Sequence, residues 1–139
     1  MNTRKSILVV EPDQEFRTAV RKMLEKAGYH VISVEDGMGA LEILEDTAVD
    51  LVISALRMPN LDGTELMQEI KRTKISAPVI FVTAYGGVDS YMDLMNMGAF
   101  DYLNKPLEER DILKAARGAL EDQGERSQNL SSSSADSFT

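Results

Sequence analysis

The sequence contains no cysteine and only one histidine, His30. Without thiols, the chain can form no disulfide and offers neither a cysteine-ligated metal site nor thiol chemistry. A single imidazole likewise excludes any metal site that is built on two histidines. Metal or anion chemistry in this chain must therefore depend on carboxylates, hydroxyls, backbone groups and the cationic side chains.

Long hydrophobic runs and an excess of positive charge are also missing. No apolar run approaches the roughly 20 residues that a membrane-spanning helix needs. Residues 1–6 are polar and lead straight into a strand-like run, which does not fit a signal peptide. The formal net charge is −8, and an acidic surface repels the phosphates of nucleic acids. We therefore expect a cytoplasmic protein with neither a membrane nor a nucleic acid as its direct partner.

The length of 139 residues and the hydrophobic content of 43% fit one domain with a substantial core. We place this domain at residues 1–120. From about Glu121 the sequence becomes polar, and it includes four consecutive serines, Ser131 to Ser134. Such a segment buries too little apolar surface to offset the entropy of ordering. Residues 121–139 are therefore predicted to form a flexible, serine-rich tail or the start of a linker.

Short apolar runs alternate five times with segments of helical periodicity. The runs lie at residues 7–10, 31–34, 51–53, 79–82 and 100–103. The helix-like segments have stripes at Phe16 to Ala27; Met38, Leu41 and Leu44; Leu66, Met67 and Ile70; Val88 to Met97; and Ile112 to Leu120. This alternation predicts an α/β fold with a doubly wound, five-stranded parallel sheet between two helix layers. Functional side chains are then expected where strands end, in loops that begin near Glu11, Ser54, Thr83 and Asn104.

Five motifs follow one another at characteristic spacings. They are ILVVEPD at 7–13, DLVISALRMPNLDG at 50–63, PVIFVTA at 78–84, GAFDY at 98–102 and LNKP at 103–106. Together they resemble the response-regulator receiver family over residues 5 to about 120, and residues 98–106 are most similar to receivers of sigma-54-type activators. The resemblance implies a flavodoxin-like (βα)5 fold of the CheY-like superfamily. It also implies a non-enzymatic role in two-component phosphorelay signalling, with a histidine kinase as a candidate partner.

The resemblance also implies roles for three residues around a phosphoryl pocket. Lys105 matches the lysine that neutralises a phosphoryl oxygen, and its bond to Pro106 is expected to be cis. Thr83 matches the hydroxyl that binds another oxygen, and Tyr102 matches the aromatic switch. Each residue also has a plainer interpretation: a solvated surface lysine, an ordinary β-branched strand residue and a core-packing ring. For Thr83 the sequence alone does not separate the two interpretations.

One essential residue of the family pattern is missing. The phosphorylated aspartate lies three residues before Met-Pro, and that position is Ala55 in this sequence. A methyl group can neither accept a phosphoryl group nor ligate a metal. Ser54 is no substitute, because adjacent side chains on a strand point to opposite faces of the sheet. We therefore expect a receiver that lacks its phospho-acceptor and acts as a protein-interaction module.

The metal ligands of the family pattern are altered as well. Glu11 keeps one carboxylate after the first strand, but the second acid is replaced by Pro12. Asp13 either supplies an oxygen or caps the first helix, and Arg57 offers a backbone carbonyl. One carboxylate and a carbonyl make a poor site for Mg²⁺, which dehydrates reluctantly. We expect Mg²⁺ binding to be weak or absent.

Two histories remain open for Ala55. Pro12 favours a naturally degenerate receiver, because an engineered block at position 55 needs no second change. The retained Thr83, Tyr102 and Lys105 favour a conventional receiver that carries a recent or engineered Asp-to-Ala change. We favour natural degeneracy.

The fourth helical segment is unusually apolar, with six hydrophobic residues in ten positions. A core-facing stripe needs only three or four per two turns, so Tyr91 or Leu94 is expected to point outward. The resemblance implies a signalling face formed by this helix, the fifth strand with Tyr102, and the fifth helix. Such a face would bind a protein partner, and a second copy of this chain, giving a homodimer, is one such partner. The alternative is that the hydrophobic side chains of this helix are packed in the core and form no binding face.

A phosphatase of the haloacid-dehalogenase type is the competing function class. That family needs an Asp-x-Asp motif after the first strand, and here Glu11 occupies the position of the nucleophile. Nucleotide binding is disfavoured, because no glycine-rich phosphate loop follows the first strand.

Overall fold

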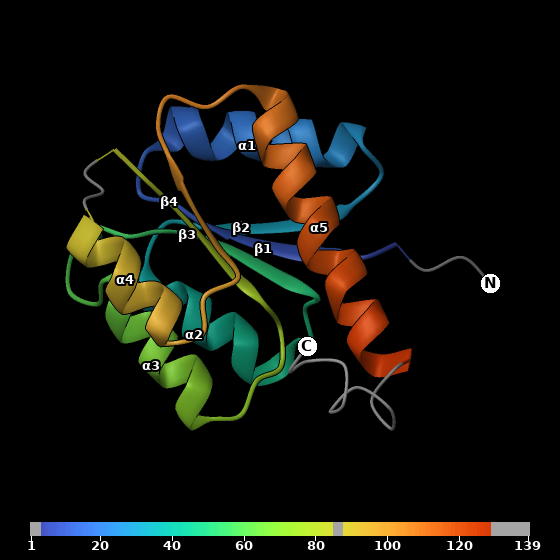
Figure 1. Cartoon of the computed structure of the whole chain (residues 1–139). Coiled ribbons are helices and arrows are strands. Elements are labelled where there is room, and N and C mark those ends of the chain that lie inside the picture. The colour runs from blue at the N-terminus through green and yellow to red at the C-terminus, as the bar shows by residue number, and fades with distance from the viewer. Residues whose placement is uncertain (1–3, 85–87, 129–139) are drawn as a thin grey trace.

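Strands and helices alternate along the chain five times, as the sequence predicts (Figure 1). The computed structural model describes residues 4–84 and 88–128. The strands are β1 (Ser6–Val10), β2 (His30–Val34), β3 (Leu51–Ala55), β4 (Val79–Thr83) and β5 (Asp101–Asn104). The helices are α1 (Gln14–Lys26), α2 (Gly37–Asp46), α3 (Gly63–Arg72), α4 (Val88–Asn96) and α5 (Glu109–Gln128).

The five strands form one parallel sheet in the order β2-β1-β3-β4-β5. Helices α1 and α5 cover one face of the sheet, whereas α2, α3 and α4 cover the other (Figure 1). The strand order reverses between β1 and β3, so the carboxyl ends of these two strands flank the switch point at which such folds place their sites. The predicted doubly wound fold is therefore confirmed.

The core is divided by the sheet into two clusters. Leu8, Val52 and Phe81 pack with the helices of one layer, and Ile7 and Ile53 pack with those of the other. Every residue of β3 and β4 is buried. This burial on both faces explains why these strands are continuous apolar runs rather than alternating ones.

The prediction that Met38 belongs to the buried stripe of the second helix is wrong. Its side chain is 54% exposed, and α2 buries Gly37, Ala40 and Leu44 instead. The backbone of Gly37 lies so close to Leu61 that a Cβ at position 37 would be 2.8 Å from the Leu61 Cδ2 atom. The packed face of α2 therefore includes Gly37, and the next residue, Met38, faces solvent.

The expectation for α4 is half right. Tyr91 is 43% exposed as predicted, but Leu94 is only 1% exposed and belongs to the core. Met92 is 52% exposed, which the apolar pattern of the segment does not predict. Leu94 and Met92 are two residues apart, which is about 200° around a helix, so burying one exposes the other. The side chain of Val88 lies outside the described residues.

Helix α5 continues beyond the expected end of the domain. It runs to Gln128, so residues 121–128, which the sequence assigns to the tail, are helical. This stretch is rich in Glu, Gln and Arg, which extend an existing helix at little cost. The serine run at 131–134 lies outside the described residues, and the domain boundary at residue 120 stays a prediction. In the part of the chain that the structure describes, no helix is long and apolar enough to cross a membrane.

Candidate functional site at the carboxyl edge of the sheet

Ala55 is the last residue of β3 and lies at the centre of the carboxyl edge. It pairs in register with Val82 of β4, and its side chain is buried, with an exposed fraction of 6%. The preceding Ser54 is 1% exposed, and its Oγ donates a hydrogen bond to the carbonyl of Ala55 at 2.8 Å. At the position of the expected acceptor the chain therefore has a methyl group, and the neighbouring hydroxyl already has an internal partner.

Lys105 and Glu11 meet at this edge although 94 residues separate them. The Lys105 Nζ lies 3.4 Å from Glu11 Oε1 and 4.2 Å from the centroid of the Phe16 ring. Glu11 is buried and Lys105 is half-buried, so this ion pair is shielded more than a surface pair. The ring adds a cation–π attraction that is strongest when the cation is partly desolvated. Lys105 is thus not a solvated surface lysine.

The second oxygen of Glu11 is used within the loop that follows β1. Glu11 Oε2 accepts the backbone N–H of Asp13 at 3.0 Å, and the guanidinium of Arg17 donates to the Glu11 carbonyl at 2.7 Å. Both oxygens of the Glu11 carboxylate therefore contact groups of this chain. The loop is fixed by its own hydrogen bonds in this conformation.

Asp13 takes the role of a helix cap. Its carboxylate accepts the backbone N–H of Glu15 at 3.1 Å at the start of α1. Arg57, the third residue considered as a ligand, is exposed. Among the described residues there is no group of three or more His, Asp or Glu side chains that could hold a metal ion. Glu11 and Asp13 lie close together, but both carboxylates already have partners within the chain: Lys105 and a backbone N–H for Glu11, and the start of α1 for Asp13.

Thr83 ends β4 next to Lys105. The backbone N–H of Lys105 donates to the Thr83 carbonyl at 2.9 Å, and Thr83 is 3% exposed. The Lys105–Pro106 peptide bond is cis, which confirms that prediction. Lys105, Thr83, Glu11 and Ala55 thus come from four chain segments to one edge of the sheet.

Tyr102 of β5 is buried beneath α4. Its ring meets Tyr91 edge-on, with centroids 5.7 Å apart and an interplanar angle of 89°. Such a T-shaped arrangement is a favourable geometry for two aromatic rings. The Tyr102 hydroxyl is fully buried and has no hydrogen-bond partner among the described residues. A buried donor without a partner loses its hydration without compensation.

This unpaired hydroxyl leads to a prediction for the Tyr102→Phe variant. We expect the variant to be more stable than the parent by about 1 kcal/mol, because it removes the desolvated hydroxyl and keeps the ring. Tyr91→Phe, at the partly exposed partner ring, is the matched control and should change little. Urea unfolding of the three proteins measures the difference. A Tyr102→Phe variant clearly less stable than the parent would show that the hydroxyl has a stabilising partner.

Two residues of the site were not identified from the sequence. The sequence predicts a core-packing role for Phe16 and no role for Arg17. Phe16 lies at the start of that stripe, close in sequence to Glu11, and this position is the only signal that it could contact the site. No local pattern marks Arg17, because its partners are backbone carbonyls in the loop after β1.

Comparisons with known proteins identify the family of this chain. Residues 7–117 match the response regulator receiver domain family. The chain is 40% identical over 115 residues to the response regulator protein FleR of Pseudomonas aeruginosa, covering 82% of this chain and 24% of FleR. It is 33% identical over 120 residues to the transcriptional regulatory protein FixJ of Bradyrhizobium diazoefficiens, covering 86% of this chain and 58% of FixJ. The chain therefore spans less than two thirds of either relative.

Solved structures show the same similarity. The signal receiver domain of an HD domain-containing protein from Pseudomonas fluorescens has a TM-score of 0.83 and 31% identity, with 88% of this chain and 99% of that domain covered. A CheY-like receiver domain protein from Methanospirillum hungatei has a TM-score of 0.85 and 27% identity, with coverages of 89% and 99%. Because the family match covers residues 7–117 and solved receiver domains share the fold, this chain belongs to the response regulator receiver domain family of two-component signalling.

Proposed function

We propose that this receiver presents a protein-interaction face without being phosphorylated. The observation that carries the proposal is Ala55, a buried methyl group at the end of β3. No carboxylate is available there to form an acyl phosphate. The neighbouring Ser54 cannot replace it, because its buried Oγ is bonded to the Ala55 carbonyl.

The surroundings of Lys105 support this proposal. In a phosphorylated receiver the corresponding lysine would contact a phosphoryl oxygen. Here the ammonium group already has Glu11 on one side and the face of Phe16 on another. These internal partners offset its charge, so the pocket does not need an anion to balance Lys105.

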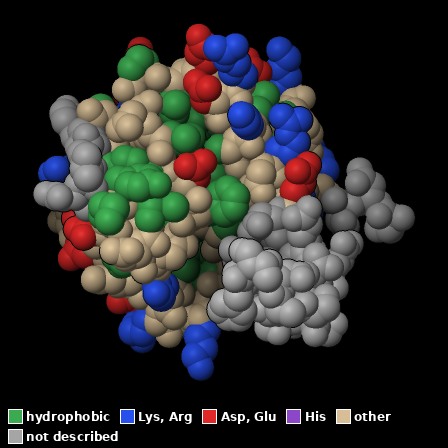
Figure 2. All heavy atoms as spheres, viewed as in Figure 1, with side chains coloured by type: hydrophobic (Ala, Val, Ile, Leu, Met, Phe, Trp, Pro, Cys, Tyr) green, Lys and Arg blue, Asp and Glu red, His purple; other side chains and the backbone are tan. Residues whose placement is uncertain are grey.

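The proposed interaction face is formed by α4, β5 and α5. Figure 2 shows hydrophobic side chains gathered in the region of α4 and β5. Tyr91 and Met92 are the large exposed hydrophobic side chains of α4, and the buried Tyr102 supports Tyr91 from below. Methionine side chains adapt to different contact surfaces, and tyrosine supplies a rigid amphipathic ring. The partner is proposed to be a protein, either a second copy of this chain, a histidine kinase or an effector, in the cytoplasm.

We infer no catalytic activity and at most weak Mg²⁺ binding. Both oxygens of Glu11 are engaged, Asp13 caps α1 and Pro12 has no acid to contribute. The competing phosphatase would need a carboxylate at Glu11 that is free for in-line attack. Hydrolysis of p-nitrophenyl phosphate above background would contradict this inference.

An NMR titration tests the proposed function. We expect the amide signals of Tyr91, Met92 and Tyr102 to stay in place when Mg²⁺ and beryllofluoride are added, because beryllofluoride must coordinate a carboxylate at position 55. The Pro12→Asp/Ala55→Asp double variant is the positive control, and the same signals should move in it. Movement in the parent chain, saturating at the ion concentrations that act on the control, would overturn the proposal.

A further inference from the structure

The outer edge of β2 has no partner strand among the described residues. β2 is the first strand in the order β2-β1-β3-β4-β5, so it pairs with β1 alone. The His30 N–H and the Val34 carbonyl bond to the residues that flank β1, at 2.9 and 3.0 Å. Because the backbone groups of successive residues in a strand alternate in direction, the N–H and C=O groups of Val31 and Ser33 point away from β1. These four groups form no hydrogen bond with any other described residue.

β2 has none of the features that usually protect an edge strand from pairing. Its sequence, HVISV, contains no proline, lysine or carboxylate, and residues 31–34 are half-buried. Val31, Ile32 and Val34 lie at the margins of the two core clusters. The other edge strand, β5, is shorter and contains Asp101, whose carboxylate accepts a backbone N–H of its own strand at 2.8 Å. β2 is therefore the edge that is better suited to accept a further strand.

A hollow of about 370 Å³ lies at the carboxyl end of this edge. Its lining residues are Arg17, Ser33, Val34, Glu35, Asp36 and Gly39. Glu35 is exposed and has no hydrogen bond or ion pair with another described residue. Asp36 uses one carboxylate oxygen to accept the Gly39 N–H at 2.8 Å, and Arg17 donates to backbone carbonyls of the loop after β1. With two carboxylates and one guanidinium that is already engaged, the hollow suits a positively charged side chain.

The chain around this edge is acidic throughout. Residues 27–56, which include β2 and α2, contain no Lys or Arg but six acids: Glu35, Asp36, Glu42, Glu45, Asp46 and Asp50. A second copy of this chain that paired through β2 would bring two such segments together, and their like charges oppose this pairing. A basic partner would be attracted by the same charges.

We propose that β2 binds an extended, basic segment of a partner protein as a sixth strand of the sheet. The backbone of this segment bonds to the outward N–H and C=O groups of Val31 and Ser33, and its apolar side chains cover the half-buried flanks of β2. One Lys or Arg side chain lies in the hollow beside Glu35 and Asp36. The surface is separate from the face formed by α4, β5 and α5, and it does not depend on the residue at position 55.

Amide hydrogen exchange measured by NMR tests the proposal. The probe is a synthetic peptide of alternating lysine and valine, about eight residues long. At saturating peptide, exchange of the Val31 and Ser33 amides should slow by about tenfold or more, because these N–H groups become hydrogen-bonded. The Ile32 amide is the internal control and should change little, since it already faces β1. A peptide that alternates lysine with proline has the same charge but cannot form the strand, and should give no such protection.

Three results of this experiment would overturn the proposal. The lysine–valine peptide could leave exchange at Val31 and Ser33 unchanged, or the lysine–proline peptide could slow it equally. Slowing that appears without peptide and grows with protein concentration would instead indicate a second copy of this chain on β2.

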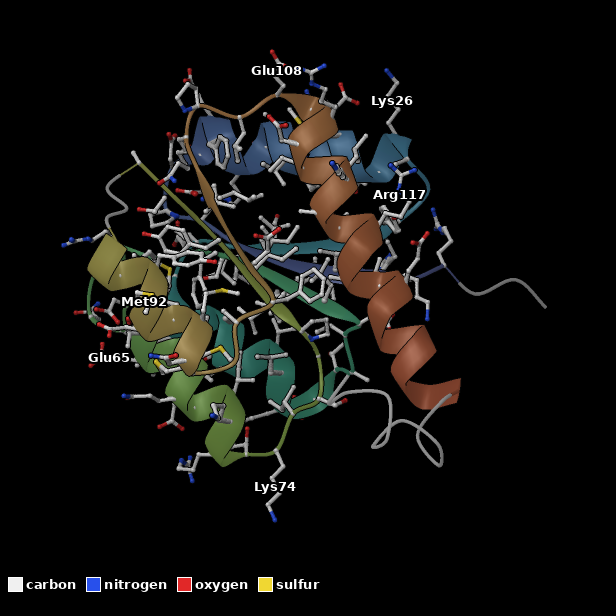
Figure 3. The ribbon with its side chains drawn as sticks, viewed as in Figure 1. Lys26, Glu65, Lys74, Met92, Glu108 and Arg117 are labelled. Carbon is white, nitrogen blue, oxygen red and sulfur yellow. The ribbon has the colours of Figure 1, made fainter. Side chains whose placement is uncertain are left out.

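The Glu35→Lys variant tests the hollow. It should weaken binding of the lysine–valine peptide by about fivefold or more, because an attraction is replaced by a repulsion. Glu108→Lys is the matched control, since it makes the same change in net charge. The Glu108 side chain is 69% exposed and points away from the body of the molecule next to the start of α5 (Figure 3). This control should keep the parent affinity to within about twofold. Equal affinities of the two variants would refute the hollow as the position of the basic side chain.

Discussion

The Gly63→Ala variant is expected to lose about 3 kcal/mol of stability, the upper range for overpacking a core position. A Cβ at this residue would lie 2.8 Å from the Phe81 Cε1, 2.9 Å from the Ala55 carbonyl oxygen and 3.0 Å from the Leu56 Cα. Two of these atoms belong to the backbone and cannot rotate away. Gly63 begins α3, and its N–H donates to the Leu56 carbonyl at 2.7 Å, which draws the two backbones together.

Urea unfolding measures this loss, and Gly118→Ala is the matched control. Gly118 lies within α5, and a Cβ there would be 3.9 Å from the Phe100 ring, an ordinary contact. The control should gain up to about 1 kcal/mol, because alanine has the higher helix propensity. A Gly63→Ala variant as stable as the parent would show that the loop after β3 can move away from Phe81.

Restoring the missing carboxylates should have the largest effect on chemistry. We expect the Pro12→Asp/Ala55→Asp double variant to be labelled by acetyl phosphate in a Mg²⁺-dependent way. Ala55→Asp alone should react far more slowly. The metal is what offsets the charge that builds up between a carboxylate and an incoming phosphoryl group, and Pro12 leaves the metal site one acid short. Intact mass spectrometry over time gives both rates.

The single variant distinguishes the two histories of Ala55. If Ala55→Asp alone is labelled as fast as the double variant, Pro12 does not impair the site. The chain would then be a conventional receiver with one altered residue. Slow or absent labelling of the single variant supports natural degeneracy. Both variants add negative charge to a pocket in which Lys105 is the nearby cation, so each should be slightly less stable than the parent without Mg²⁺.

The fold could be predicted from the sequence because each element has a strong local signal. Buried runs of β-branched residues alternate with helical stripes, and only a parallel sheet between helix layers satisfies both. Details that depend on tertiary contacts could not be predicted. Met38 is exposed because α2 packs through Gly37, which lies close to Leu61 in the loop after β3, a contact between segments far apart in the sequence. Leu94 is buried because it lies on the face of α4 that packs against the core.

The candidate site was predictable to the extent that it depends on strand ends. Glu11, Thr83 and Lys105 lie at the carboxyl ends of three strands of a parallel sheet, so the topology alone brings them to one edge. The contact between Lys105 and the ring of Phe16 was not predictable, because this ring reaches the site from α1. The sequence did not decide whether Asp13 is a metal ligand or a helix cap, and in the structure its carboxylate caps α1.

The intact mass of this chain after incubation with acetyl phosphate and Mg²⁺ tests the central claim most directly. The account predicts an unchanged mass, because position 55 carries a methyl group, while the Pro12→Asp/Ala55→Asp variant under the same conditions gains the mass of one phosphoryl group. A phosphoryl adduct on the parent chain that hydroxylamine removes, as expected of an acyl phosphate, would contradict the account, and peptide mapping would then locate the carboxylate that accepts it.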